Sequence, residues 1–485
     1  MISVHDAGVA GAFGELSRFR TEFYECMTAR ADALFELTDA VLCADGPVHS
    51  LVELSLVGEH RRGHGSLYAA LARGGLDIAR LRWALSAVRL PRAADGRLVL
   101  AVDVTCWLRP EAHTSPERIL CHTYGRGKDQ HLMIPGWPYS VICALESGRS
   151  SWTAPLDARR LAPGEDTATV TAAQLRQTIE RLIAAGHWRT GDPDIWIVAD
   201  AGYDGPRLAH LLKDLPVQVL ARMRSDRVLR RAAPPQVPGT RGRPRRHGGE
   251  FVFGDATTWG TPDVTTTSDT RLYGRATVRS WDRLHPRLTH RSAWVAQTGA
   301  LPIIAGTLIR LQIEHLPSGA IPKPVWLWWS GTDATPADVD RLWQAFLRRF
   351  DIEHTFRLLK QTLGWTCPKI RTPQAADRWT WIMLAAYTQL RLARPLATDL
   401  RRPWERPAPP QRLTPARVRR GFRHLRPQLT GPAGAPKPSR PGPGRPPGRP
   451  NNRPTPRHDV HIIGKTDAKK RRTRKSTTPR QRRTG

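Results

Sequence analysis

LVLAVD at residues 98–103 and IWIVAD at residues 195–200 decide the fold of this chain. Short apolar runs rich in Val, Ile and Leu are typical of strands buried inside a sheet. A carboxylate at the end of such a strand lies at the edge of a rigid sheet, where loops are open to a ligand. Asp103 and Asp200, which end these runs, are therefore candidate metal ligands, although either aspartate alone is more typical of a turn or a helix cap.

The segments around these two runs alternate between strand and helix patterns. Further apolar runs predict strands at residues 141–145, 151–156 and 217–221. An apolar stripe at helical spacing predicts a helix over residues 171–185, and a shorter helix is expected near residues 206–212. The resulting order of three strands, helix, strand, helix and strand indicates an α/β core.

A third candidate carboxylate lies in a long helical pattern further along the chain. At about 100° per residue, Phe346, Arg349, Glu353 and Lys360 fall within an arc of about 60° on one face of a helix. This face carries an aromatic ring, two cations and a carboxylate. The alternative is an amphipathic helix with a solvated basic face.

This spacing resembles the signature helix of DDE transposases of bacterial insertion sequences, in which tyrosine, arginine, glutamate and lysine occur at the same intervals. Phe346 stands where that family usually has tyrosine, so the ring is kept and the hydroxyl is lost. The resemblance is to a branch common in actinobacteria and spans roughly residues 50 to 450. Its stretches are residues 100–110 (LAVDVTCWLRP), 134–139 (IPGWPY), 197–203 (IVADAGY), 347–360 (LRRFDIEHTFRLLK) and 413–422 (LTPARVRRGF).

The resemblance implies a ribonuclease H-like catalytic core of the α/β class in which Asp103, Asp200 and Glu353 are catalytic and bind metal. Such an enzyme cuts DNA at the ends of its element and joins the freed strands to target DNA. Two Mg²⁺ ions, or Mn²⁺, would stabilise the attacking and leaving oxygens, because Mg²⁺ prefers oxygen ligands. Arg349 and Lys360 are then expected to bind DNA by clamping phosphates.

Five segments are expected along the chain. They are an N-terminal helical domain at 1–95, a first core segment at 96–223, a β-rich insertion at 224–330, a second core segment with the signature helix and C-terminal helices at 331–430, and a disordered basic tail at 431–485. In the first of the five, Phe19, Phe23, Met27 and Ala31 recur at helical spacing, and Asp77 is expected to cap a further helix. Whether these helices bind the element's ends or brace the core stays open.

The insertion carries two possible DNA contacts. Strands are predicted around residues 251–253 and 308–311, and Trp259, Trp281 and Trp294 are candidates to hold a flipped base, although Trp is more often buried in a core. The sequence RGRPRR at residues 241–246 resembles an AT-hook, so Arg241 and Arg243 are candidate minor-groove contacts. The alternative is a basic loop that touches phosphates without sequence preference.

Charge points to a polyanionic partner. The 485 residues include 75 Lys and Arg against 43 Asp and Glu, a formal charge of +32, and residues 401–485 alone contain 25 basic and 3 acidic residues. Double-stranded DNA, both as terminal inverted repeats and as target, is the expected partner, bound in part by counterion release from the tail. The resemblance implies a homodimer in a synaptic complex. A ribonuclease H-like nuclease that does not transpose, and a non-catalytic basic DNA-binding protein such as a decayed transposase, remain alternatives.

Cysteine use and hydropathy indicate the compartment. The six cysteines form no C-x-x-C pair, which argues against a disulfide scaffold or a zinc ribbon. No apolar run approaches the ~18 residues of a membrane span, and the first residues do not resemble a signal peptide. The expected location is therefore the bacterial cytoplasm, in association with the nucleoid and not with a membrane.

Overall fold

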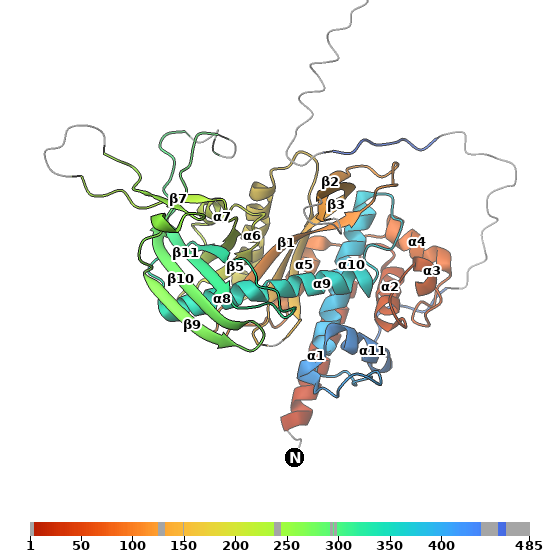
Figure 1. The fold of residues 1–485 in the computed structure, drawn as a ribbon. Helices are drawn as coiled ribbons and strands as arrows, with labels where there is room; N and C mark the ends of the chain where they lie inside the picture. The colour runs from red at the N-terminus through yellow and green to blue at the C-terminus, as the bar shows by residue number, and fades with distance from the viewer. Residues whose placement is uncertain are drawn as a thin grey trace, which may run out of the picture.

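The structure, a computed structural model, describes residues 4–124, 131–148, 150–236, 244–291, 294, 298–437 and 454–461. The fold is mixed α/β, with helices at the N-terminus and one large mixed sheet in the middle (Figure 1). This arrangement agrees with the predicted α/β class and is consistent with a ribonuclease H-like core. Within the described residues, no helix is both long and apolar enough to cross a membrane.

The large sheet joins the core to the insertion. Among the described residues it has ten strands, in the order β2-β3-β1-β5-β6-β12-β11-β10-β9, with β4 paired to β3. Strand β1 is antiparallel to β3 and parallel to β5, and β5 is parallel to β6. The strands are β1 Val99–Leu108, β2 Ile119–Tyr124, β3 His131–Leu145, β4 Thr153–Arg160, β5 Ile195–Ala199, β6 Val217–Met223, β9 Val264–Thr270, β10 Gly274–Leu284, β11 Gly306–Ile313 and β12 Val325–Trp329.

The core departs from the predicted element order at one place. Four strands, not three, precede α6 (Thr167–Ala184), because β2 pairs with the first half of a long β3. Gly136 and Pro138 make this half of β3 resemble a turn in the sequence. Gly136 is needed there because a Cβ would come within 2.6 Å of the carbonyl oxygen of Trp107 on β1. The predicted short helix is confirmed as α7 (Gly205–Leu211), capped by Asp204.

The predicted β-rich insertion does not form a sheet of its own. Strand β12 pairs with β6, with Trp329 opposite Leu220, so β9 to β12 extend the core sheet. Only β7 (Val228–Arg230) and β8 (Glu250–Val252) form a separate pair among the described residues, and η1 (Ala256–Thr258) follows them. The aromatic residues between these layers form a second apolar core: Phe251, Phe253, Trp281, Trp326 and Trp328.

The N-terminal region is helical, as predicted, but its first helix is shorter than the apolar spacing suggests. The chain turns at Arg30, whose φ is +55°, so the predicted stripe from Phe19 to Ala31 is divided between two helices. Asp77 caps the last helix of the region by accepting a hydrogen bond from the Arg80 N–H at 3.0 Å. The helices are α1 Val4–Glu25, α2 Ala31–Cys43, α3 Leu51–Leu54, α4 His64–Arg73 and α5 Ile78–Ala87.

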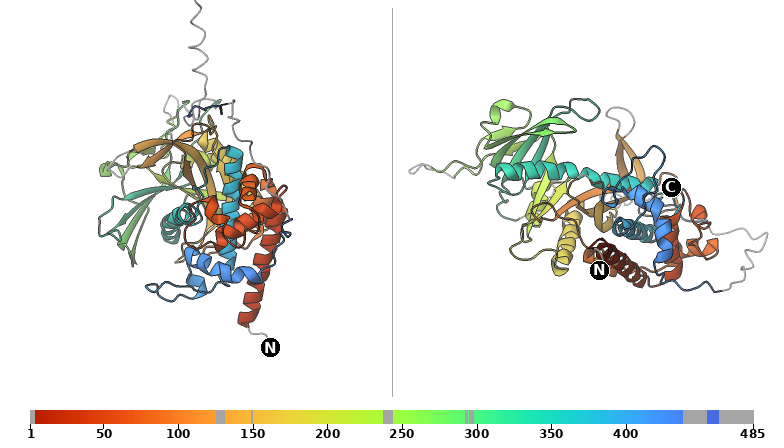
Figure 2. Two further views of the ribbon diagram at one scale, coloured as in Figure 1. Left: turned by 90° about the vertical axis from the view of Figure 1, so that its right-hand side faces the viewer. Right: turned by 90° about the horizontal axis from the view of Figure 1, so that it is seen from below.

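After the insertion, two helices run almost end to end across the sheet (Figure 1). They are α8 (Pro336–Arg348) and α9 (Phe350–Gln361), separated only by Arg349, which keeps helical φ and ψ. The next helix, α10 (Pro373–Ala393), is buried along most of its length and lies between the sheet and the N-terminal helices (Figure 2). It is followed by η3 Pro410–Arg412, α11 Pro415–Leu425 and η4 Arg426–Gln428.

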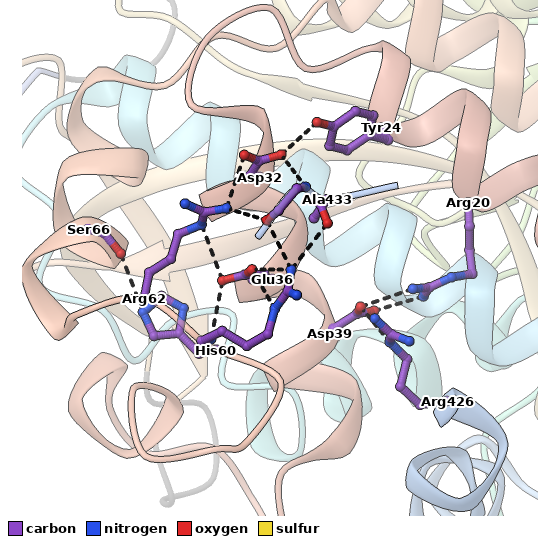
Figure 3. A network of polar contacts seen from close by, with 12 residues as sticks. Arg20, Tyr24, Asp32, Glu36, Asp39, His60, Arg62, Ser66, Arg426 and Ala433 are labelled. Carbon is purple, nitrogen blue, oxygen red and sulfur yellow. Dashed lines mark hydrogen bonds and ion pairs between the residues drawn. The ribbon is translucent and has the colours of Figure 1, made fainter. Parts of the chain in front are cut away.

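A buried polar network ties the first helices to the end of the folded body (Figure 3). Arg20 on α1 and Asp39 on α2 are both fully buried, and Arg20 donates to Asp39 at 2.8 and 2.9 Å. Arg426 donates to the same carboxylate at 2.6 Å. Breaking such a pair would leave an uncompensated buried charge, which typically costs about 3–5 kcal/mol. The network therefore fixes η4 onto the N-terminal helices.

Two stretches of the predicted tail, residues 431–437 and 454–461, contact the folded body. The carbonyl oxygen of Gly434 accepts from Arg62 at 2.8 Å. In residues 454–461, His461 forms an isolated parallel bridge to Ile119 at the start of β2: its N–H donates to the Arg118 carbonyl oxygen at 2.8 Å, and its carbonyl oxygen accepts from the Leu120 N–H at 2.9 Å. Strand β2 is an edge strand with unpaired backbone groups, which explains why a segment of low apolar content attaches there.

Candidate active site

Sheet register places the two predicted aspartates side by side. Strands β1 and β5 are parallel, with Val102 opposite Ala199, so the next residues in each strand direction are Asp103 and Asp200. Asp103 lies within β1 and accepts from the Val104 N–H at 2.8 Å, whereas Asp200 begins the turn after β5. The two apolar runs therefore bring their terminal carboxylates to one point of the sheet.

One arginine joins these aspartates to the predicted glutamate. The Arg349 guanidinium donates to Asp103 at 2.9 Å and to Glu353 at 3.0 Å, and it lies 3.9 Å from Asp200. The three carboxylates come from β1, the loop after β5 and α9, which are far apart in the sequence. The structure thus gathers Asp103, Asp200 and Glu353 around a single cation.

Burial sets the electrostatics of this cluster. Arg349 is 3% exposed, while the side chains of Asp103, Asp200 and Glu353 are 20%, 35% and 43% exposed. Burial raises the pKa of Asp103 to about 6, although the Arg349 charge acts in the opposite direction. The Oδ1 atom of Asp200 is buried without a hydrogen-bond partner among the described residues. The cluster therefore contains carboxylate oxygen that a further cation could use.

Aromatic rings cover Arg349 from its own helical segment. Its guanidinium carbon lies 5.9 Å from the centroid of the Phe346 ring and 5.4 Å from that of Phe350. A cation within about 6 Å of a ring face is attracted by the ring quadrupole. Phe346 is buried and therefore serves this face through its ring, without needing a hydroxyl. The helix face predicted from the spacing therefore points into the protein at Phe346 and Arg349. The alternative, a solvated basic face, is excluded for these two residues.

Lys360 lies apart from the carboxylates and is only partly exposed. Its Nζ atom is 5.8 Å from the centroid of the Trp365 ring. Burial lowers the pKa of Lys360, and the neighbouring thiols Cys106 and Cys121 act in the opposite direction. Lys360 and Glu353 lie on the same helix, as predicted. Among the described residues, however, Lys360 makes no contact with Arg349 or with the three carboxylates.

Tyr203 is a residue of this site that sequence reasoning missed. It follows Asp200 in the turn, and its N–H donates to the Asp200 carbonyl oxygen at 3.1 Å. Its hydroxyl is buried without a partner among the described residues, and burial next to Asp103 raises its pKa well above the usual value. The motif ADAGY contains this tyrosine, but the sequence alone does not indicate that its side chain turns inward.

Divalent metal ions would suit this cluster in donor chemistry. Carboxylate oxygens are the ligands that Mg²⁺ prefers, and Asp200 Oδ1 accepts no hydrogen bond among the described residues, although Arg222 Nη1 lies 3.6 Å from it. Among the residues that the structure describes, however, no three Asp, Glu, His or Cys side chains are arranged to hold a metal ion as they stand. Arg349 already forms ion pairs with the carboxylates of Asp103 and Glu353. A metal ion at these residues would therefore compete with Arg349 for the oxygens of Asp103 and Glu353 that it contacts.

A basic cavity of about 730 Å³ opens beside Asp200. Arg222 connects the two, since its Nη1 lies 3.6 Å from Asp200 Oδ1 and its side chain also lines the cavity. Asp204 and Glu250 are the acidic residues of the lining. The cavity is rich in arginine and also contains one indole: Arg222, Arg224, Arg227, Arg230, Arg287, Arg291 and Trp294. Its charge and its position suit a phosphate backbone that passes the carboxylates.

The three candidate tryptophans have different environments. Trp281 is 1% exposed in the aromatic core of the insertion, so it is a packing residue. Trp259 packs against that core and donates from Nε1 to the Val252 carbonyl oxygen at 2.8 Å. Trp294 lines the basic cavity, with its ring centroid 5.3 Å from that of His210. Arg241 and Arg243, the predicted AT-hook contacts, lie outside the described residues.

Comparison with known proteins shows the family to which this chain belongs. Residues 22–287, more than half of the chain, match the family described as DDE superfamily endonuclease, and the chain belongs to this family. Membership implies cleavage of phosphodiester bonds, and DDE enzymes generally use divalent metal. Asp103 and Asp200 fall inside the matched range, whereas Glu353 lies beyond it.

The comparison with solved structures finds distant similarity. The Drosophila P element transposase strand transfer complex is similar to 38% of this chain at 16% sequence identity, with a TM-score of 0.15. The match covers 36% of that protein, so the chain spans about a third of its length. No curated protein sequence matches this chain significantly.

Proposed function

We propose that this chain is the transposase of an insertion sequence, which cuts DNA at the ends of its element and joins the freed ends to target DNA. The observation that carries the proposal is the convergence of Asp103, Asp200 and Glu353 on Arg349. The spacing of the signature helix and the membership of the endonuclease family support it.

In this proposal, Asp103, Asp200 and Glu353 would hold the divalent ions. When bound, such ions stabilise the attacking and leaving oxygens of a phosphodiester displacement. The chain's own role is to align the DNA: Arg222 and the other arginines of the basic cavity would hold phosphates beside Asp200. The partial burial of Asp103 strengthens its electrostatic contacts relative to those of a fully solvated carboxylate.

The segments of the chain would divide the work. The helices of residues 1–95, which pack against α10, would brace the core or bind the terminal inverted repeats, and residues 96–223 with 331–430 would form a ribonuclease H-like core. The insertion at 224–330 would hold DNA beside the core, because the basic cavity lies between its loops and the Asp200 turn. Joining two element ends requires two active sites, so a homodimer in a synaptic complex belongs to the proposal.

Nicking of supercoiled plasmid tests the cleavage step. The wild-type chain should nick a plasmid that carries the element's ends when Mg²⁺ or Mn²⁺ is added. Asp103→Asn, Asp200→Asn and Glu353→Gln should each abolish nicking and keep binding to the ends, because the basic contacts remain. A variant that cuts at the wild-type rate removes its residue from the site. Binding without any metal-dependent nicking would favour a non-catalytic DNA-binding protein.

A strand-transfer assay separates the transposase from a nuclease that does not transpose. Precut ends with a free 3′-hydroxyl should be joined to target plasmid by the wild-type chain and not by Asp200→Asn. Nicking without joining would assign the chain to the nuclease alternative.

A further inference from the structure

A basic groove begins beside Glu353 on α9 and continues onto α11. One stripe of α9 is exposed, because the following residues recur at intervals of three or four: Phe350, His354, Arg357 and Gln361. Glu353 lies beside this stripe, and its side chain is 43% exposed. A cavity of about 220 Å³ joins the last three residues of the stripe to the first turn of α11. The groove therefore starts within one residue of the carboxylate cluster.

A second cavity continues this groove along α11. It has a volume of about 350 Å³ and shares Thr362 and Ala416 with the first cavity. Four arginines line it: Arg402, Arg419, Arg420 and Arg423. The next cavity, beside α3, is lined by Glu53 and Glu59, so the basic surface ends there. The two cavities together are called the α9–α11 groove.

Positive charge exceeds negative charge in the α9–α11 groove. Its lining contains five arginines, Arg357 of the first cavity and the four of the second. Two carboxylates pair with members of this set: Asp45 with Arg423 and Glu405 with Arg420. The arginines therefore leave an excess of three positive charges. A polyanion complements such a surface.

Two of the five arginines are exposed and have no carboxylate partner. The side chain of Arg357 forms neither a hydrogen bond nor an ion pair among the described residues. The guanidinium carbon of Arg402 lies 5.6 Å from the ring centroid of Trp404, which is 75% exposed, and this side chain also forms no ion pair within the described part of the chain. A phosphate that enters the groove can therefore contact both guanidinium groups without displacing a carboxylate.

The sheet order places the α9–α11 groove and the basic cavity on opposite sides of β1. Helix α9 packs against β1, β3 and β4. The basic cavity is lined by the turn after β5 and by the end of β6. Because the strand order is β3-β1-β5-β6, the strand that carries Asp103 lies between the two basic surfaces. A DNA backbone that crosses the carboxylates from the basic cavity would next meet α9.

We propose that the α9–α11 groove binds the backbone of double-stranded DNA that extends past Glu353 from the basic cavity, with Arg357 and Arg402 on its phosphates. The path of the DNA rests on the proposed function, because it takes the three carboxylates as the cutting site. Binding of phosphates in the groove does not require cleavage.

Fluorescence anisotropy with a labelled duplex that carries an element end tests the groove, without added metal and at several salt concentrations. Arg357→Gln combined with Arg402→Gln should lower the affinity at least about tenfold at about 0.1 M salt. The slope of log affinity against log salt should become shallower by about 1.8, since each lost phosphate contact contributes about 0.9. The Tm should stay at the wild-type value, because both side chains are exposed and form no ion pair among the described residues.

Arg189→Gln combined with Arg271→Gln is the matched control. It removes the same charge from two exposed positions outside the groove: Arg189 precedes β5, whose opposite end leads to Asp200, and Arg271 lies in the β9–β10 turn at the far edge of the sheet. This variant should keep the wild-type affinity and salt slope. Wild-type affinity and slope in the groove variant, or an equal loss in the control, would overturn the proposal.

Duplexes that extend from the cut site in one direction only test the path of the DNA. The difference between the wild-type chain and the groove variant should occur with one of the two duplexes and disappear with the other. An equal difference with both would contradict the proposed path.

The outcome for the groove is separable from the outcome for cleavage. Wild-type DNA binding by the groove variant, together with metal-dependent nicking by the wild-type chain, would remove the groove and leave the proposed function intact. Asp200→Asn should bind the duplex with the wild-type salt slope, because its arginines are unchanged. Loss of nicking with an intact effect of the groove variant would instead contradict the proposed function alone.

Discussion

The guanidinium of Arg349 donates to the carboxylate of Asp103 at 2.9 Å across 246 positions of sequence, and only 3% of its side chain is exposed. The same group reaches Glu353 at 3.0 Å. Arg349 therefore acts as the internal counter-ion of the cluster when no other cation is present. An arginine in this position both stabilises the gathered carboxylates and competes with any metal ion for their oxygens.

Replacement of Arg349 should lower the stability without metal and increase the stabilisation that metal ions provide. Arg349→Met should lower the free energy of unfolding without metal by about 1–3 kcal/mol, because it leaves the partly exposed carboxylates of Asp103, Asp200 and Glu353 without their counter-ion. Saturating Mg²⁺ or Mn²⁺ should then raise the Tm of the variant more than that of the wild type. Arg357→Met, which removes an exposed arginine from the same helix, is the control and should resemble the wild type in both measurements. Equal metal-induced shifts in Arg349→Met and the wild type would contradict this role.

Substitution of Trp281 and of Trp294 should distinguish a residue that packs the core from a residue that contacts DNA. Trp281→Ala should lower the free energy of unfolding by about 3–5 kcal/mol, because it creates a cavity in the aromatic core of the insertion. Trp294→Ala should leave stability nearly unchanged and weaken DNA binding, since the ring lines the basic cavity. Thermal denaturation and gel-shift titration of both variants provide the measurement. Equal DNA affinity of Trp294→Ala and wild type would remove Trp294 from the DNA surface.

How far the sequence could predict this structure depended on the kind of signal. Asp103 and Asp200 stand out because a carboxylate ending an apolar run is a local pattern, and the parallel register of β1 and β5 then brings the two together. The direction in which Arg349 points was not predictable, because helical spacing defines a face but not what covers it. The sequence therefore suggested a phosphate clamp, which stays a prediction, and did not indicate the contacts of Arg349 with Asp103 and Glu353.

The sequence did not predict the first half of β3 or the extension of the core sheet, and the reason is similar. Gly136 and Pro138 are turn residues by local preference, yet tertiary contact with β1 keeps them in a strand. The extension of the core sheet by β9 to β12 depends on the pairing of β12 with β6, a contact between residues about 100 positions apart. Local patterns carry no information on such pairings, so the insertion was expected as a separate unit.

A histidine pair should make the insertion sensitive to acid. His247 Nδ1 lies 2.9 Å from His285 Nε2, which requires one ring to donate and the other to accept. Burial lowers the pKa of both, and nearby charges lower it further: the other histidine for His285, and Arg246, Arg287 and Arg230 for His247. The unfolded chain therefore binds more protons than the folded chain below about pH 6.5, so stability falls as the pH falls through that value.

Thermal denaturation between about pH 7.5 and about pH 5.5 measures this effect. His247→Gln keeps a hydrogen-bonding side chain that does not titrate, so its Tm should fall less on acidification than that of the wild type. His290→Gln replaces an exposed histidine nearby and should keep the wild-type pH dependence. An unchanged pH dependence in His247→Gln would show that the pair does not titrate in this range.

Two nested deletions should separate the structural segment of the tail from its DNA-binding segment. Residues 462–485 contain ten basic residues and one acidic residue, so their removal should weaken non-specific DNA binding. It should also flatten the dependence of log affinity on log salt, by about 0.9 for each phosphate that the tail no longer neutralises. The Tm should stay at the wild-type value, because His461 still pairs with the start of β2. Removal of residues 454–485 should reduce the salt dependence equally and additionally lower the Tm, because it exposes the edge of β2. Fluorescence anisotropy at several salt concentrations measures the first effect, and thermal denaturation of both deletions measures the second. An equal Tm for both deletions would mean that the pairing of His461 with β2 contributes nothing to stability.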